Sequence, residues 1–248
     1  MAPVNKYTKE VENTLKQASI NHDKEKALKL QRYLGTKLHV YGLESKLQTD
    51  ICKQGFSFYS DDKQKTFLEF NSVFLESTSH EGKNQAYIYL DRNYKHITPE
   101  TQHEILPAWV HKVDNWAHSD YLSKFLTKLL ENEATKKSML TKIKTWNHDS
   151  NEWIRRQSLV SLHYYARTKK NHTDFNTTKQ LVLNLINDEN YFVQKAVGWT
   201  LRESYNIYPK ETYTLIKQNV KHITPTAFTT CLEKMNESEK ISLKQLRK

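Results

Sequence analysis

The sequence predicts an all-α protein, folded as a HEAT-like helical-repeat solenoid (an α-α superhelix) with a concave basic face. Three observations support this fold class. Only 5 of the 248 residues are Gly and 5 are Pro, which favours long helices joined by short connections over tight turns. Apolar side chains recur at helical spacing along the chain, without a convincing period-two strand run. A weak internal repeat has a period close to the ~40 residues of HEAT-type helix pairs.

Helix signals follow one another along the chain. Apolar side chains repeat at helical spacing over residues 11–19, 25–34 and 66–74. Thr98 and Thr224 each place a capping hydroxyl before a proline at the first helical position, Pro99 or Pro225. Further helix starts are predicted at Asp61-Asp62, at Asn176-Thr177-Thr178 and at Pro209. Because no low-complexity linker divides the chain, we predict a single domain over residues 1–248.

The repeat predicts which side chains become neighbours. Residues 153–157 (WIRRQ) can be laid over residues 192–196 (FVQKA), an offset of 39, and the segment ending at Trp116 resembles a third copy, 37 residues before Trp153. Equivalent helices of a solenoid line one surface. Asp120, Arg156 and Lys195, near the starts of these helices, are therefore expected to be neighbours. Coincidental similarity between amphipathic helices is the alternative.

Charge indicates a polyanionic partner. Lys and Arg number 38 against 28 Asp and Glu, a net charge of +10. Nine basic residues gather between residues 136 and 170, where the acidic residues are Asp149 and Glu152. Such an excess favours nucleic acid as a partner without proving it. The alternative is a solvated helix surface.

Several classes of site are excluded. Cys52 and Cys231 lie far apart, which argues against a disulfide framework or a cysteine-rich zinc site and favours a reducing compartment. There is no His-Glu-x-x-His motif and no glycine-rich nucleotide fingerprint, since Gly198 stands alone in a predicted helix and is expected to permit close helix packing. We therefore expect no metal and no cofactor.

The location of the protein follows from its termini and hydropathy. The amino terminus lacks the apolar core of a signal peptide, and no run approaches the roughly 20 apolar residues that span a bilayer. We expect a cytoplasmic protein, nucleoid-associated if bacterial, that does not enter a membrane. A solenoid of this length is expected to be a monomer.

A candidate site emerges from helical spacing. Trp116 and Asp120 are four residues apart on a predicted helix, so they share a face. If the helix carrying Trp199 lies beside it, a carboxylate stands between two indoles, with Arg155 or Arg156 nearby. Two aromatic planes and one anion suit a cationic ligand. The alternative is ordinary, because tryptophan usually packs in a core and an aspartate near a helix start usually stabilises the helix end.

Other aromatic residues have structural interpretations. We expect Trp109, Trp146 and Trp153 to pack in the core or between repeats. Tyr164-Tyr165 could stack on a base, but packing between repeats is the preferred interpretation.

Three segments together resemble the AlkD-type DNA alkylation repair family, the HEAT-like-repeat DNA glycosylases. They are residues 113–120 (VDNWAHSD), 153–156 (WIRR) and 191–203 (YFVQKAVGWTLRE). The last is the most specific, being long and ungapped. A looser similarity to the amino-terminal helices of the family is found in residues 31–34 (QRYL) and 41–43 (YGL). The resemblance covers most of the chain, from Lys24 to Met235.

The resemblance implies roles for individual residues. It assigns the catalytic carboxylate to Asp120, the flanking aromatics to Trp116 and Trp199, and the site arginine to Arg156, with Arg155 as the register alternative. The residues expected to contact DNA are Tyr33, Lys112, Arg155, Arg156, Lys195 and Arg202. Many relatives carry an acidic residue directly after the first tryptophan, where this chain has Ala117-His118, so the departure bears on substrate range.

The implied activity is excision of positively charged N-alkylated purines, 3-alkyladenine and 7-alkylguanine, from duplex DNA by hydrolysis of the N-glycosidic bond. The family resemblance implies capture of the nucleotide through its backbone, without base flipping. Because family membership alone does not fix the chemistry, two alternatives stay open. One is a non-catalytic HEAT-repeat protein that binds damaged or branched DNA, and the other is a HEAT-type module that binds an acidic protein.

Overall fold

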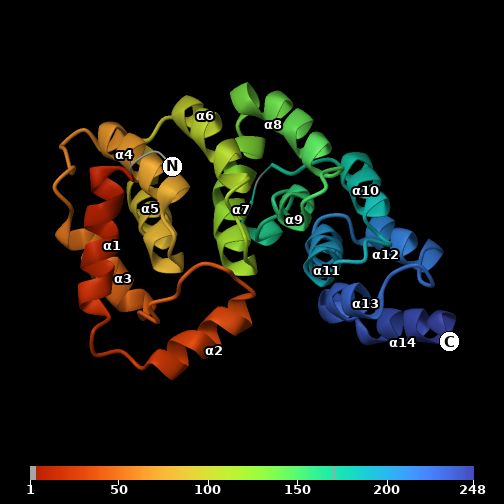
Figure 1. The fold of residues 1–248 in the computed structure, drawn as a ribbon. Helices are drawn as coiled ribbons and strands as arrows, with labels where there is room; N and C mark the ends of the chain where they lie inside the picture. Colours follow the sequence, from red (N-terminus) through yellow and green to blue (C-terminus); the bar gives the residue numbers. More distant parts are fainter. Residues whose placement is uncertain (1–3, 170) are drawn as a thin grey trace. The chain divides into compact units, whose positions relative to one another are not determined.

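The computed structural model describes residues 4–169 and 171–248, which form fourteen α-helices and three short 3-10 helices (Figure 1). Their only strand-like pairing, within these ranges, is a single bridge between His39 and Ser79. The predicted all-α class is therefore confirmed. Lys170, one of the nine residues of the basic segment, and the first three residues of the amino terminus lie outside the described residues.

The chain divides into two compact units, Met1–His118 and Ser119–Lys248. The border falls inside one helix, α7 (Trp116–Glu131). Each unit is described by itself below. The single domain expected from the sequence stays a prediction.

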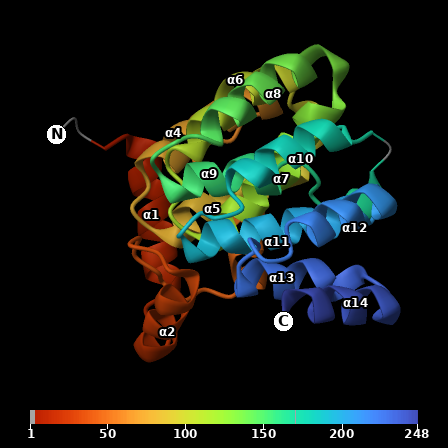
Figure 2. The same ribbon diagram turned by 90° about the vertical axis from the view of Figure 1, so that its right-hand side faces the viewer.

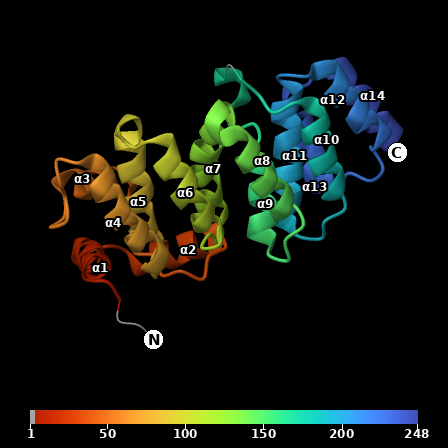
Figure 3. The same ribbon diagram turned by 90° about the horizontal axis from the view of Figure 1, so that it is seen from above.

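The first unit is built around the packing of α4 against α5, with α1 against both and α3 against α5 (Figure 3). Its helices are α1 (Lys6–Ala18), α2 (Lys24–Leu34), α3 (Ser45–Gln54), α4 (Lys63–Glu76), α5 (His80–Asn93) and α6 (Pro99–Val110), followed by the start of α7. Phe67, Phe70, Phe74, Tyr87 and Trp109 are fully buried between these helices. Stacking of Phe74 on Trp109, with ring centroids 4.1 Å apart, confirms the predicted core position of this tryptophan.

Predicted helix starts in the first unit are confirmed. Asp62 caps α4, its side chain accepting from the amides of Gln64 and Lys65. Thr98 caps α6, with Pro99 in the first turn. These caps satisfy amides that a helix leaves without internal partners.

The second unit is organised around α11 (Tyr191–Tyr205), which packs against α9, α10, α12 and α13 (Figure 2). Besides α7 from Ser119 onward, the other helices are α8 (Glu133–Trp146), α9 (Glu152–Val160), α10 (Phe175–Asn184), α12 (Pro209–Gln218), α13 (Pro225–Cys231) and α14 (Glu237–Arg247). Gly198 permits the α11–α13 contact, because a Cβ there would lie 2.5 Å from the Ala227 oxygen. Trp146 and Trp153 are buried, as predicted.

One predicted helix start in this unit is wrong. Helix α10 begins at Phe175, capped by Asp174, rather than at residues 176–178, because the Asp174 carboxylate accepts from the Thr177 amide. Thr224 and Pro225 do start α13, and Pro209 does start α12.

Three asparagines mark the repeat. Asn151 caps α9, Asn190 caps α11, and the Asn115 side chain accepts from the His118 amide at the start of α7. Counting from these caps puts Asp120, Arg156 and Lys195 at the same place, five residues beyond the cap. The first copy is therefore offset by 36 residues from the second, and the 37-residue alignment predicted from the sequence is wrong by one.

Candidate functional site

Asp120 and Arg156 form the central contact of the candidate site. Nη2 of Arg156 donates to Oδ1 of Asp120 over 2.6 Å, and Nη1 donates to the Phe192 main-chain oxygen over 2.8 Å. The arginine side chain is 7% exposed, whereas the Asp120 side chain is 41% exposed. One buried guanidinium thus joins α7, α9 and α11 and fixes a carboxylate that is still accessible from outside.

A polar seam holds the two helices that carry this pair. Gln157 on α9 donates to the hydroxyls of Ser123 and Ser161 over 2.8 and 2.9 Å, and accepts from the Ser119 hydroxyl over 3.1 Å. The Thr127 hydroxyl donates to the Ser161 oxygen over 2.7 Å. All these residues are buried, and sequence reasoning missed them. Because buried hydrogen-bonded networks specify one arrangement, the seam fixes the register between α7 and α9.

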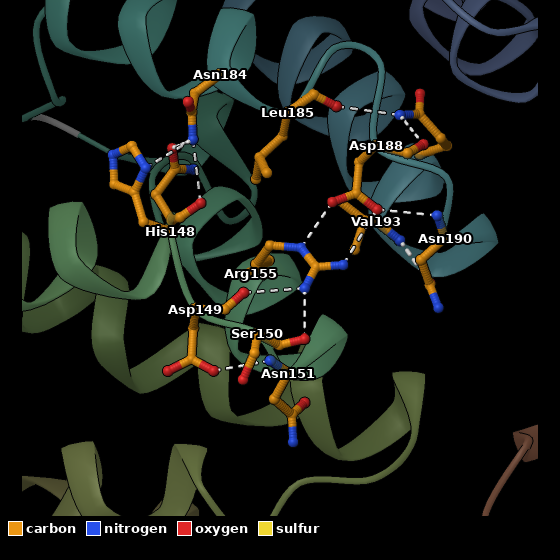
Figure 4. A network of polar contacts seen from close by, with 12 residues as sticks. His148, Asp149, Ser150, Asn151, Arg155, Asn184, Leu185, Asp188, Asn190 and Val193 are labelled. Atoms are coloured by element: carbon orange, nitrogen blue, oxygen red, sulfur yellow. Dashed lines mark hydrogen bonds and ion pairs between the residues drawn. The ribbon is translucent and has the colours of Figure 1, made fainter.

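The Arg155 side chain makes its hydrogen bonds to other groups of the protein (Figure 4). Its Nε donates to Asp188 over 2.6 Å and its Nη2 to the same carboxylate over 3.3 Å, while Nη1 donates to the main-chain oxygens of Asp149 and Ser150. The clamp joins the loop before α9 to the loop before α11. Between the two register alternatives, Arg156 is the arginine that contacts Asp120. A DNA contact by Arg155 stays a prediction.

The signal for the clamp is present in the sequence. Asp149 and Asp188 each stand two residues before a capping asparagine and accept from its amide, over 2.8 and 2.9 Å. This Asp-x-Asn pattern repeats at an offset of 39 residues. The pattern indicates two equivalent structured loops, one before each capping asparagine. An arginine side chain can link two such loops, as Arg155 does here.

Trp199 on α11 is half-buried and has two neighbours in its own unit. The Tyr164 ring centroid lies 6.0 Å from the tryptophan ring, and the Arg202 guanidinium lies 5.6 Å above it. Arg202 also donates to Glu203 over 3.1 Å and to Glu233 over 2.7 Å. The predicted aromatic residue is thus flanked by a cation whose charge is already balanced, and DNA binding by Arg202 stays a prediction.

Trp116 and Tyr33 are paired in the first unit. The Trp116 indole donates to the Tyr33 main-chain oxygen over 3.1 Å, and the rings meet edge to face with centroids 5.4 Å apart. Tyr33 on α2 is 69% exposed. Lys112 in this unit and Lys195 in the second are both exposed. These three residues are therefore accessible to a ligand, as the sequence prediction requires.

His118, next to the departure from the family pattern, is fully buried. Its ring stacks on His80 with centroids 4.3 Å apart. Burial holds the pKa of His118 well below its usual value, and the nearby His80 and Lys83 lower it further. His118 is therefore a neutral part of the core of the first unit.

Two kinds of site receive no support within residues 4–169 and 171–248. No group of three or more His, Cys, Asp or Glu side chains is placed to hold a metal ion. In the same ranges, no helix combines the length and the apolar character needed to cross a membrane. Cys52 and Cys231 are both buried and unpaired.

Comparison with known proteins identifies the class. The family model described as "DNA alkylation repair enzyme" matches residues 14–235. A solved structure described as a predicted DNA alkylation repair enzyme from Enterococcus faecalis is similar, with TM-score 0.66 and 20% identity over 87% of this chain and 97% of the other. At that identity the likeness shows the fold alone. A search of curated proteins returned no match.

Two further solved structures, both from Streptococcus mutans, are more distant. AlkD2 aligns with TM-score 0.48 and 17% identity over 90% of this chain and 96% of the other. The smu.31 protein of strain UA159 aligns with TM-score 0.45 and 16% identity over 97% of each chain. The all-helical fold and the match along the chain place this protein among helical-repeat proteins of DNA repair. It belongs to the DNA alkylation repair enzyme family.

Proposed function

We propose that this protein is a DNA N-glycosylase that releases positively charged N-alkylated purines, such as 3-alkyladenine and 7-alkylguanine, from duplex DNA. The observation that carries the proposal is the bond from Arg156 to Asp120, which holds a partly exposed carboxylate in one position. Family membership supports the damage class, and the net charge of +10 supports DNA as the partner.

The chemistry requires little from the protein. An alkylated ring nitrogen gives the purine a positive charge, so the base departs neutral and needs no general acid of the kind that glycosidases use. Asp120 stabilises the positive charge that develops on the sugar and orients the attacking water. In this proposal Trp116 and Trp199 pack against the deoxyribose and favour the same charge.

The exposed side chains provide the DNA contacts. Lys112, Lys195 and Tyr33 are accessible and would bind the phosphate backbone, which positions a duplex without reading its sequence. Capture through the backbone leaves the base stacked, so the enzyme would act without base flipping. No cofactor enters this scheme. The protein would act as a monomer and bind the DNA on its own basic concave face.

The proposal is tested by the substrate range. The protein is incubated with duplexes that carry either 7-methylguanine, which is charged, or hypoxanthine, which is not, and the free base is measured by chromatography. We expect release of 7-methylguanine and no release of hypoxanthine above background. Equal release of both bases would contradict the proposed role of the lesion charge.

Binding distinguishes the alternatives. If the protein binds alkylated duplex but liberates no base, it is a DNA-binding scaffold. If its binding to DNA is absent or insensitive to salt, the phosphate contacts proposed here are wrong. The basic surface then binds an acidic protein instead.

A further inference from the structure

The loop that follows α9 presents two tyrosines beside Trp199. The Tyr164 ring lies between the other two, with centroids 6.0 Å from Trp199 and 4.6 Å from Tyr165. The Tyr165 ring meets Tyr164 edge-on, at 90°, and Tyr165 is 60% exposed. Trp199, Tyr164 and Tyr165 therefore form an aromatic cluster that runs from the candidate site out to the surface of the second unit.

The backbone at Tyr165 is strained. Its φ of 49° and ψ of 55° lie in the left-handed region, and no other non-glycine residue in the described ranges has a positive φ. A side chain with a Cβ adopts this conformation at a cost, which glycine avoids and asparagine reduces. Because the Tyr165 ring is mostly exposed, burial does not account for a tyrosine here. Such outliers persist where the surroundings hold them and are concentrated at binding sites.

Helix α11 holds the loop in place. The buried Glu203 accepts from the Ala166 amide over 3.2 Å, and Nε of Arg167 donates to the Asn206 side chain over 2.9 Å. Both anchors lie on or directly after the helix that carries Trp199. The tyrosine loop is thus positioned by the same element as the candidate site.

Two cations near the cluster are already paired with carboxylates, whereas the exposed Arg167 donates to the neutral Asn206 side chain. Arg202 is bonded to Glu203 and Glu233, and Lys169 pairs with Glu131 over 2.9 Å with its side chain only 13% exposed. Paired cations are poor phosphate ligands. The exposed Tyr165 ring suits a flat, uncharged partner that stacks on it, as nucleobases do on tyrosine.

We propose that Tyr165, supported by Tyr164, stacks on an unpaired nucleobase, the base opposite the abasic position that base release leaves. The inference rests on the proposed function in that it takes damaged duplex DNA as the ligand. It adds a contact that recognises the lost pairing rather than the alkyl group. Such a contact favours a duplex with an unpaired base over an intact one.

The test uses two fluorescent duplexes, one intact and one with a tetrahydrofuran abasic analogue opposite thymine, titrated with protein in an anisotropy assay. We expect Tyr165→Gly to weaken binding to the abasic duplex by roughly five- to tenfold, within the range of one base–aromatic stack, and to leave intact-duplex affinity unchanged. Tyr165→Phe keeps the ring and should keep the preference. Because glycine relieves the strain, the Tm of Tyr165→Gly should not fall. An unchanged Tm excludes unfolding as the cause of the weaker binding.

The outcomes separate this inference from the proposed glycosylase activity. Unchanged affinity of Tyr165→Gly for the abasic duplex, or equal losses on both duplexes, overturns the stacking role. Release of 7-methylguanine by the wild-type protein is measured in parallel. If base release fails while the Tyr165-dependent preference holds, the glycosylase proposal is wrong and the stacking contact stands. The reverse pattern overturns only the stacking contact.

Discussion

At the scale of single residues, the position of the Asp120 carboxylate depends on one buried arginine. The Arg156 guanidinium is planar and offers separate donors, one to Asp120 and one to the Phe192 oxygen. A lysine has one ammonium group on a flexible stem and cannot reproduce both bonds in the same geometry. Arg156 is therefore a positioning residue, which acts on the reaction through Asp120.

Arg156→Lys tests this role. We expect single-turnover release of 7-methylguanine to slow by roughly tenfold to a hundredfold, because small misplacements of a catalytic group have effects of that size. Affinity for the duplex should change by less than about twofold, since the positive charge is kept. Arg247→Lys on α14 is the matched control and should release base at the wild-type rate. An unchanged rate in Arg156→Lys would show that the arginine does not position the Asp120 carboxylate for the reaction.

The candidate site could be predicted from sequence only in part. Helical spacing and the repeat correctly indicated that Asp120 and Arg156 are neighbours. They could not choose between Arg155 and Arg156, because the choice depends on Asp188 and two main-chain oxygens that belong to folded loops. The contact of Tyr164 with Trp199 was also out of reach, because it depends on an irregular loop that helical periodicity does not describe.

At the scale of elements, α11 is the centre of the second unit and its packing depends on Gly198. A Cβ at this position would lie 2.5 Å from the Ala227 oxygen and 2.9 Å from the Ala227 Cα, which are backbone atoms. Backbone cannot move aside as the end of a flexible side chain can. The lack of a side chain at residue 198 therefore sets the distance between α11 and α13.

Gly198→Ala should destabilise the protein. Overpacking typically costs about 1–3 kcal/mol, and a clash with backbone atoms belongs to the upper part of this range, above the gain of about 1 kcal/mol that alanine brings inside a helix. We expect a lower urea midpoint with an unchanged slope of the transition. Thr214→Ala, an exposed helical position on α12, serves as the control and should not lower the midpoint. An equal or higher midpoint for Gly198→Ala would show that α13 can move away from α11 and accommodate the methyl group.

Helix starts were predictable where one residue dominates the capping. Asp62, Thr98 and Thr224 cap their helices as the sequence indicates, each through a side chain that accepts from a helix amide. The start of α10 was misplaced because cap-forming side chains are crowded there. Asp174 satisfies the Thr177 amide, and local preference alone does not rank it above the residues that follow.

At the scale of the whole molecule, buried histidines make stability depend on pH. Burial, the largest cause, lowers the pKa of His80 to about 4 and of His163 to about 3, and holds that of His118 well below 6.5. Between pH 6.5 and these values the unfolded chain binds protons at histidine that the folded chain does not. Stability is therefore lost as the pH falls. Glu81 acts in the opposite direction, because burial raises its pKa.

We expect the free energy of unfolding to fall as the pH is lowered from about 6.5 to 4. Each histidine contributes a slope of up to about 1.4 kcal/mol per pH unit. Urea titrations across this range measure the slope. His163→Gln should reduce it by about the contribution of one proton. A stability that is flat between pH 7 and 4.5 would contradict the neutral state of these side chains.

The function of the whole protein is tested most directly at Asp120. A duplex containing 7-methylguanine is mixed with excess protein, and release of the free base is followed in a single turnover for the wild type, Asp120→Asn and the control Asp50→Asn. We predict that Asp120→Asn is slower by at least about a hundredfold while it binds the duplex as the wild type does, and that Asp50→Asn is unaffected. Equal rates for the wild type and Asp120→Asn would contradict the proposed role of the carboxylate.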